Sequence, residues 1–384
     1  MNLFSYLKGD KVIWTIVLLL SIISVLVVYS SIVTLAYKYK SGDTSYYLIK
    51  HSLIIGMGIF LMYLTHTIKY TYYSRLSQLA LFVAAPLLLF TLLKGANLNE
   101  ASRWLEVPGT GLTFQTSDFA KLALIAYVAR MLALKQNEIK DFKKTFLPIV
   151  IPIVAICGLI LPANFSTSAV LFTTCMVLLF IGRVSFKHLG ILLLSAVMAF
   201  SIFILIIFAF PNINNRVATW KARIENFSKN DSEGNYQVEQ AKIAIATGGV
   251  VGKGPGKSTQ RNFLPHPYSD FIFAIIIEEY GLGLALVIVL LYLILLYRAI
   301  NIAGKCQKTF GSLLAIGCCF LLVFQAMINM AVAVNLFPVT GQPLPLVSMG
   351  GTSIWFTSIA FGIILSISRD LDPEPPKTET LETA

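Results

Sequence analysis

Charged residues are scarce in this chain. They make up 13% of its 384 residues, whereas an ordinary soluble domain contains about 25%. Apolar residues account for 56% of the chain. A protein folded in water cannot bury that much apolar side chain, because it keeps too large a surface for its volume. The composition therefore excludes a water-soluble globular fold.

Cysteine and histidine are also scarce, with five and four residues. No Cys-x-x-Cys or His-x-x-x-His spacing occurs among them. Disulfide frameworks and structural zinc sites depend on such groupings, so the sequence predicts neither. The cysteines, most of which fall in apolar stretches, are expected to be small buried side chains.

Acidic residues are outnumbered by basic ones, which gives a net charge of +11. In a soluble protein such an excess suggests nucleic-acid binding. Here the Lys and Arg residues lie mostly in short segments between apolar runs, as membrane topology requires. Membrane lipid is therefore the expected partner, and nucleic acid is not.

Long apolar runs are what the chain has in abundance. Each is about long enough to cross a hydrocarbon slab of ~30 Å as a helix. The runs are continuous and do not alternate, so a β-barrel is not expected. The predicted fold class is all-α: a polytopic membrane protein with about ten transmembrane helices, at residues 13–36, 46–66, 76–94, 118–134, 145–162, 166–182, 187–210, 269–297, 309–335 and 347–368.

The distribution of basic residues predicts the orientation in the membrane. Loops on one side contain Lys8, Lys11, Lys69, Arg75, Lys135, Lys140, Lys143, Lys144, Arg183, Lys187, Arg298, Lys305, Lys308 and Arg369, and short loops on the other contain Lys38, Lys40, Lys94 and Arg103. The side rich in Lys and Arg faces the cytoplasm. Both termini are therefore expected in the cytoplasm.

This topology makes residues 211–268 a large extracytoplasmic loop between the seventh and eighth helices. Within it, Tyr236–Thr247 is expected to form a short helix along the membrane surface, because its apolar residues share one face. A glycine-rich stretch, 248–256, follows. Residues 1–369 are predicted to form a single transmembrane domain, and the acidic, proline-rich tail 370–384 is expected to be disordered.

Three acidic residues stand at the start of the eighth helix. Asp270 follows a proline-rich entry, and two interpretations stay open for it. It is either a helix-capping or first-turn acid stabilised by the helix dipole, or a carboxylate available for chemistry. Glu278 and Glu279 lie two turns deeper in apolar sequence, where ionisable groups face either a buried partner or a cavity.

A second cluster combines Arg103-Trp104 with the segment Phe114–Lys121. Asp118 and Lys121 are three residues apart, so they share one face of the fourth helix. One interpretation is a local ion pair with Trp104 as an interfacial anchor. The other is a basic wall, formed by Arg103 and Lys121, beside an anionic lipid headgroup.

A third cluster, residues 335–353, contains proline and glycine too densely for a regular helix. Irregular backbone at membrane depth is tolerated only where protein or a water-filled cavity satisfies its polar groups. Gln325 and Asn329 lie four residues apart on the ninth helix. We expect them to add polar groups to this cavity wall.

In this order, the three clusters resemble the SEDS family (shape, elongation, division and sporulation), whose branches are typified by FtsW and RodA. The matching stretches are Arg103-Trp104 with Phe114–Lys121, then 248–261 with Ser269-Asp270 and Glu278-Glu279, and finally Leu344–Ser353. The spacing from Gly256 to Pro265 is more similar to the division branch than to the elongation branch.

The chain departs from the family pattern at three places. Thr116-Ser117-Asp118 stands where the family usually has Pro-Ser-Glu, which shortens the carboxylate. Leu264–Tyr268 lacks the glutamate that usually precedes the key aspartate. Pro162–Ser166 lacks the aspartate of the usual Pro-Asp-x-Gly. The resemblance therefore carries no role of these missing acids over to this chain.

The resemblance implies a peptidoglycan glycosyltransferase that polymerises lipid II, a disaccharide-peptide on undecaprenyl diphosphate, at the outer face of the bacterial inner membrane. Asp270 would act as general base on the acceptor hydroxyl, and cations would stabilise the departing diphosphate. The sequence requires no cofactor, and a divalent cation at the diphosphate stays open. The candidate substrate-binding residues are Arg103, Lys121, Asp118, Arg216, Lys242, Lys253, Gln260, Ser348, Gly350, Gly351 and Ser353.

The resemblance also implies a class B penicillin-binding protein transpeptidase as partner, other divisome proteins, and a location at the division septum. Three alternatives stay open: an elongation-type polymerase, a lipid II flippase or other transporter, and a non-catalytic divisome scaffold. A transport site is expected near the membrane midplane, where Glu278 and Glu279 would be candidates.

Overall fold

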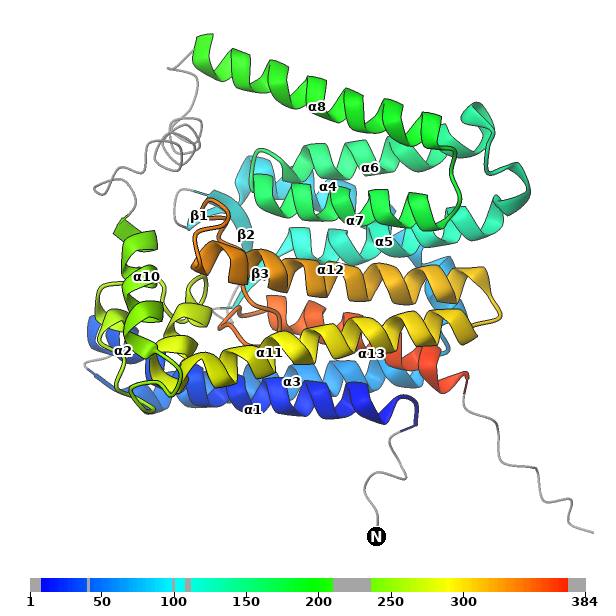
Figure 1. Ribbon diagram of the computed structural model, residues 1–384. Coiled ribbons are helices and arrows are strands. Elements are labelled where there is room, and N and C mark those ends of the chain that lie inside the picture. Colours follow the sequence, from blue (N-terminus) through cyan, green and yellow to red (C-terminus); the bar gives the residue numbers. More distant parts are fainter. Residues whose placement is uncertain (1–7, 40–41, 99–100, 108–111, 210–235, 372–384) are drawn as a thin grey trace, which may run out of the picture.

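The computed structural model describes residues 8–39, 42–98, 101–107, 112–209 and 236–371. Most of its helices run side by side in one bundle (Figure 1). The helices are α1 (Lys11–Ser31), α2 (Val33–Tyr39), α3 (Thr44–Thr67), α4 (Thr71–Lys94), α5 (Thr116–Leu134), α6 (Leu147–Ile160), α7 (Phe165–Ile181), α8 (Phe186–Ala209), α10 (Tyr236–Gly248), α11 (Ile272–Lys305), α12 (Thr309–Ala333) and α13 (Ser353–Arg369).

Each apolar run predicted to span the membrane corresponds to a helix. Among the described residues, six helical segments are long and apolar enough to cross a bilayer, and three shorter helices are apolar as well. The tenth, α5, carries Asp118, Lys121 and Arg130, so its composition alone does not mark it as a span. The chain is a polytopic membrane protein, as the sequence predicts.

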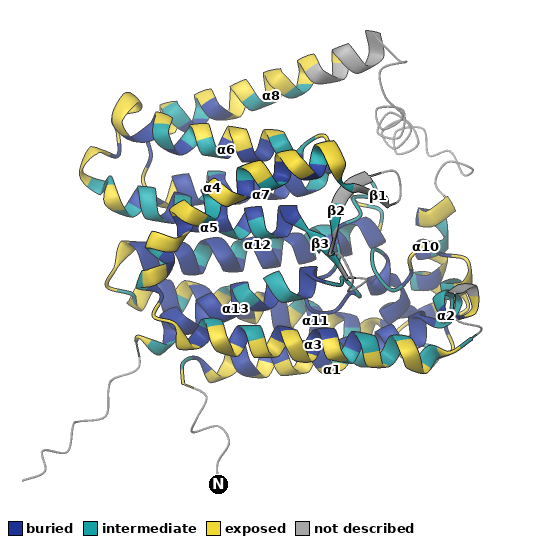
Figure 2. Ribbon diagram, turned by 180° about the vertical axis from the view of Figure 1, so that it is seen from behind, coloured by how far each residue is buried: buried dark blue, intermediate teal, exposed yellow. Residues whose placement is uncertain are grey.

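Side chains on the outside of the bundle are largely apolar. Figure 2 shows exposed residues along the outer faces of α1, α3 and α8 and buried residues between the helices. Phe82, Phe186 and Leu194 are among the most exposed large hydrophobic side chains. Such exposure is costly in water and favourable against lipid, so it agrees with a membrane-embedded bundle.

The two ends of the described chain meet at one end of the bundle (Figure 1). The backbone N–H of Asp10 donates to the Ser368 hydroxyl at 2.6 Å. The Arg298 guanidinium also binds the Asp10 carboxylate, with its Nε 2.7 Å from Oδ2. Both ends of the described chain therefore lie on the same side, and the positive-inside distribution makes this the cytoplasmic side.

The described residues confirm the all-α fold class, and a small antiparallel sheet at the opposite end of the bundle adds to it. It has the order β1-β2-β3, with strands β1 (Ala96–Leu98), β2 (Ala101–Val107) and β3 (Leu112–Gln115). Trp104 pairs with Gln115 across β2 and β3. Strands this short produce only a weak alternating pattern in a sequence, which explains why they were missed.

Small residues allow α13, which follows the third cluster, to pack closely against α3. Gly58 on α3 faces Ser358 on α13, where an added Cβ would lie 2.7 Å from the Ser358 hydroxyl. Gly362 on α13 is still more crowded, with 1.8 Å between an added Cβ and the Thr65 hydroxyl. Such contacts are typical of helix packing in membranes, where close approach replaces the hydrophobic effect. They place α13 firmly against α3.

Candidate functional site

Asp270 lies in the turn that leads into α11, at the end of the bundle opposite the termini. The Ser269 hydroxyl donates to Asp270 Oδ1 at 2.9 Å, and the Asn329 amide donates to the Asp270 carbonyl oxygen at 3.0 Å. The residue is half-buried. Oδ2 has no hydrogen-bond partner among the described residues and faces the backbone of Gly341, where an added Cβ would lie 3.6 Å away. One carboxylate oxygen is thus held, and the other can accept a proton.

The helix-capping interpretation of Asp270 is wrong. α11 begins at Ile272, Phe271 occupies the N-cap position, and no side chain caps the helix. Phe271 has φ −112° and ψ 19°, and the helix begins three residues after the predicted start at residue 269. Asp270 has no capping role because it precedes the N-cap residue.

The proline- and glycine-rich segment between α12 and α13 has no regular helix, as predicted. Ser348 is its main contact with the Asp270 turn. The Ser348 hydroxyl donates to the Ser269 carbonyl oxygen at 2.7 Å and accepts from the Leu344 N–H at 2.8 Å. The Met349 N–H donates to the Tyr268 carbonyl oxygen at 2.9 Å. This segment therefore forms one wall of the Asp270 site.

Gln325 and Asn329 on α12 satisfy the carbonyl groups of this irregular segment, which confirms their predicted place. The Gln325 amide donates to the Pro343 carbonyl oxygen at 2.9 Å. The Asn329 amide donates to the Gln342 carbonyl oxygen at 2.7 Å, besides its bond to Asp270. Asn329 therefore joins the irregular segment to the backbone of the candidate base.

Asp118 and Lys121 form a buried ion pair on α5, as their spacing suggested. Lys121 Nζ lies 2.7 Å from Asp118 Oδ1, and the two side chains are 7% and 3% exposed. Lys121 Nζ also donates to Gln325 Oε1 at 3.4 Å. Both residues line a small cavity together with Gln325 and Ser353, so the second and third clusters meet here.

The helix α12 relates the two parts of the site. Lys121 contacts it at Gln325, and Asp270 contacts it at Asn329, four residues nearer its outer end. A rise of 1.5 Å per residue puts these levels roughly 6 Å apart along α12. The candidate base therefore stands at the mouth, with the buried lysine about one turn deeper.

The start of α13 is joined to the β-sheet. The Thr352 hydroxyl donates to the Thr113 carbonyl oxygen at 2.9 Å and accepts from the Gln115 N–H at 3.4 Å. The neighbouring Gly351 has φ +54°, in the left-handed region that favours glycine. With Gly350, it lets the chain turn sharply between Ser348 and Ser353.

The structure places the remaining predicted site residues elsewhere or does not describe them. Lys253 is paired with Glu278, at 2.6 Å, and the Gln260 N–H also donates to this carboxylate, at 3.3 Å. Lys242 is exposed on α10. Arg103 lies in β2, but the structure does not describe its side chain, and Arg216 lies outside the described residues.

The sequence analysis missed several residues that hold the site together. Gln342 donates to the Thr167 hydroxyl on α7 at 2.7 Å, and the Ser24 hydroxyl on α1 donates to the Val347 carbonyl oxygen at 2.8 Å. Neither hydroxyl stands in a recognisable motif, so no local signal could have revealed them. The described residues contain no group of three or more His, Cys, Asp or Glu residues placed to hold a metal ion.

Comparisons with known proteins match nearly the whole chain. The family of FtsW, RodA and SpoVE, described as "Cell cycle protein", matches residues 10–372. Stage V sporulation protein E of Bacillus subtilis is 32% identical over 94% of this chain and 97% of its own length. A probable peptidoglycan glycosyltransferase FtsW of Trichlorobacter lovleyi is 32% identical over 97% of this chain and 96% of its own.

Two solved structures share the fold. One, reported as structural coordination of polymerization and crosslinking by a peptidoglycan synthase complex, matches with a TM-score of 0.72 at 24% identity and covers 95% of this chain and 99% of its own. The other is the rod shape determining protein RodA of Thermus thermophilus, with a TM-score of 0.67 at 22% identity over 96% of this chain and 100% of its own.

Proposed function

Since this chain belongs to the family of FtsW, RodA and SpoVE cell cycle proteins, we propose that it is a peptidoglycan glycosyltransferase. It polymerises lipid II at the outer face of the bacterial cytoplasmic membrane, with Asp270 as general base. The curated relative that is 32% identical over 97% of this chain is named as a probable enzyme of this type.

The placement of Asp270 is the observation that carries this proposal. Its backbone is held by Asn329 and its Oδ1 by Ser269, while Oδ2 is left without a partner among the described residues. Glycosyl transfer to a sugar hydroxyl needs a base within hydrogen-bond reach of that hydroxyl. An oriented carboxylate at the outer mouth of the bundle meets this need.

Lys121 is the cation best placed to act on the leaving diphosphate. Its ammonium group lies about one helical turn below Asp270 and lines the cavity that also contains Gln325 and Ser353. A positive charge held in a water-poor site stabilises developing negative charge far better than it does in water. Asp118 orients Lys121, while Lys242 and Arg103 are the cations that we assign to the outer rim.

A second, small cavity lies between α4, α5 and the end of α6, where Leu88, Leu92 and Leu159 supply apolar walls. Thr116 and Ser117 add hydroxyl groups on α5, next to Asp118. The cavity has room for roughly one water molecule, which is too little for an isoprenoid chain, so we assign no part of the lipid to it.

We further propose that the protein acts in division, at the septum, together with a class B penicillin-binding protein transpeptidase and other divisome proteins. Named FtsW relatives at about the same identity as the sporulation protein support this branch. The solved structure of a peptidoglycan synthase complex, which shares the fold, supports a partner of this class.

The positions of the acidic residues favour an enzyme over a transporter. Asp270 stands at the outer end of the bundle, whereas a transported substrate is expected near the membrane midplane. Glu278 and Glu279, the candidates for such a site, bind the segment 253–261 of the extracytoplasmic loop instead. A non-catalytic scaffold would leave Asp270 without a role.

Polymerisation of fluorescent lipid II by the purified protein, with and without the transpeptidase, tests this proposal. Asp270→Asn keeps the shape of the side chain and removes its basicity, so we expect glycan polymer to disappear from the gel. Glu239→Gln on α10 is the matched control, because it removes one negative charge from the same end of the protein. Its product should equal that of the wild type.

Two results would overturn the proposal. A silent Asp270→Asn variant would leave the scaffold interpretation. Absence of polymer together with lipid II movement across a liposome bilayer would establish the flippase instead.

A further inference from the structure

Two adjacent glutamates, Glu278 and Glu279, are fully buried where α11 is interrupted. The interruption is at Gly281, whose φ of 75° lies in the left-handed region. Beside it, two N–H groups of the segment 249–254 donate to the carbonyl oxygens of Glu278 and Glu279, at 2.9 and 2.8 Å. The extracytoplasmic segment is thus bonded directly into the backbone of α11.

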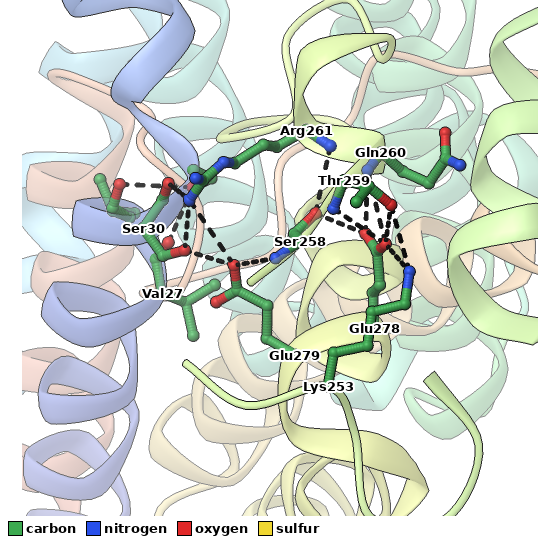
Figure 3. Close-up of polar contacts among 11 residues, drawn as sticks. Val27, Ser30, Lys253, Ser258, Thr259, Gln260, Arg261, Glu278 and Glu279 are labelled. Atoms are coloured by element: carbon green, nitrogen blue, oxygen red, sulfur yellow. Dashed lines mark hydrogen bonds and ion pairs between the residues drawn. The ribbon is translucent and has the colours of Figure 1, made fainter. Parts of the chain in front are cut away.

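The Glu278 carboxylate binds the next part of the same segment (Figure 3). Lys253 Nζ lies 2.6 Å from Oε1, and the Thr259 N–H donates to the same oxygen at 3.1 Å. The Ser258 hydroxyl donates to Oε2, and the Gln260 N–H lies 3.3 Å from it. Both carboxylate oxygens therefore accept hydrogen bonds from the segment 253–260.

Glu279 extends these contacts to α1 (Figure 3). Its Oε1 accepts from the Ser30 hydroxyl and from the Ser258 N–H, the latter at 3.2 Å. Arg261 Nη1 lies 4.0 Å from the same oxygen and donates to the Ser30 carbonyl oxygen at 2.9 Å. The first helix, the loop and α11 meet at this one carboxylate.

The charges of this network are balanced. Lys253 and Arg261, 28% and 18% exposed, face two carboxylates with no exposure. A buried carboxylate is strongly unfavourable without a compensating cation. We infer that Lys253 and Arg261 neutralise the two glutamates, and that Lys253 is not a ligand of the diphosphate.

Asp270 lies between the two halves of this network. Arg261 is the last residue of the network before Asp270 in the chain. Glu278, eight residues after Asp270, is the first residue of the network that follows it. We propose that Glu278 and Glu279 are positioning residues, which set the place of Asp270 by closing this stretch of chain on itself. The proposal rests on the proposed function, because it assigns Asp270 the role of base.

Charge-compensation variants test the proposal through kcat and KM of lipid II polymerisation. Lys253→Met leaves Glu278 buried and unpaired, so we expect kcat to fall by at least about tenfold while KM changes by less than about twofold. In the double variant with Glu278→Gln, both charges are gone, and the amide oxygen keeps one of the two accepting positions while the amide nitrogen loses the other. We expect its kcat to rise clearly above that of Lys253→Met without reaching the wild-type value.

Lys257→Met is the matched control. Lys257 is an exposed lysine of the same segment, so its loss changes the charge of the loop equally and should leave kcat unchanged. Had Lys253 bound the diphosphate, the double variant would remain slow and its KM would rise. That outcome would overturn the proposal.

Hydrogen–deuterium exchange of the backbone over residues 249–262 gives a second readout, independent of activity. We expect faster exchange in Lys253→Met and exchange near the wild-type rate in the double variant. Slow polymerisation with wild-type exchange in Lys253→Met would refute the positioning role.

If Lys253→Met does not fold, Arg261→Met with and without Glu279→Gln provides the same comparison. If the wild type makes no polymer, the proposed function fails, whereas the exchange experiment still tests the anchoring.

Discussion

Removing one charge from the Asp118–Lys121 pair distinguishes a structural lysine from one that acts on the substrate. The Asp118 side chain is only 3% exposed, and Lys121→Met removes the cation that neutralises it. Asp118 Oδ2 already has no partner among the described residues. Loss of one member of a buried ion pair costs about 3–5 kcal/mol, whereas replacing both members by neutral groups costs little. We therefore expect Lys121→Met to be strongly destabilised, and Lys121→Met/Asp118→Asn to regain most of that stability.

The same two variants separate stability from catalysis. If Lys121 stabilises the departing diphosphate, the double variant remains slow by about 100-fold or more although it is folded. Thermal unfolding in detergent, followed by tryptophan fluorescence, measures the stability of each variant. The amount of polymer formed from lipid II measures its catalytic activity.

The exposed pair of Lys144 with Glu138 provides a control for these variants. Lys144 Nζ lies 3.5 Å from Glu138 Oε1, and the two side chains are 63% and 45% exposed. Loss of this pair should lower the free energy of unfolding by less than about 1 kcal/mol. A double variant that polymerises at the wild-type rate would show that Lys121 serves only to compensate Asp118. Wild-type stability of Lys121→Met would contradict the buried pair itself.

Three further predictions concern the loop, the topology and α12. Gly281→Ala puts a Cβ 2.2 Å from a backbone carbonyl oxygen and should lower the melting temperature far more than Gly249→Ala, which has a positive φ but open space. In intact cells, a membrane-impermeant maleimide should label Lys242→Cys and leave the native Cys306 unlabelled; the reverse would invert the topology. Asn329→Leu removes the hydrogen-bond donor of two carbonyl groups. We expect the stability to fall by about 1–3 kcal/mol for each carbonyl group left buried without a donor, with a parallel loss of polymer. Unchanged polymerisation would exclude a role of Asn329 in placing the base.

The helices were predictable from the sequence because spanning a membrane depends on local length and composition. The same holds for the Asp118–Lys121 pair, whose partners are one helical turn apart, and for the irregular segment before α13, where proline and glycine exclude a helix. The short helix at Tyr236–Gly248 was also predicted, from its amphipathic pattern. All these features depend on residues close together in the chain.

Only the tertiary structure decided which groups meet. Lys253 stood out as a candidate ligand of the diphosphate, yet it pairs with Glu278, 25 residues away. Glu279 binds Ser30, which is 249 residues distant. The sequence by itself determined a polytopic membrane protein with about ten membrane-spanning helices and polar groups at its outer end, since those properties are local. The partners of Glu278 and Glu279 depend on how distant segments pack against one another, and no local pattern encodes that choice.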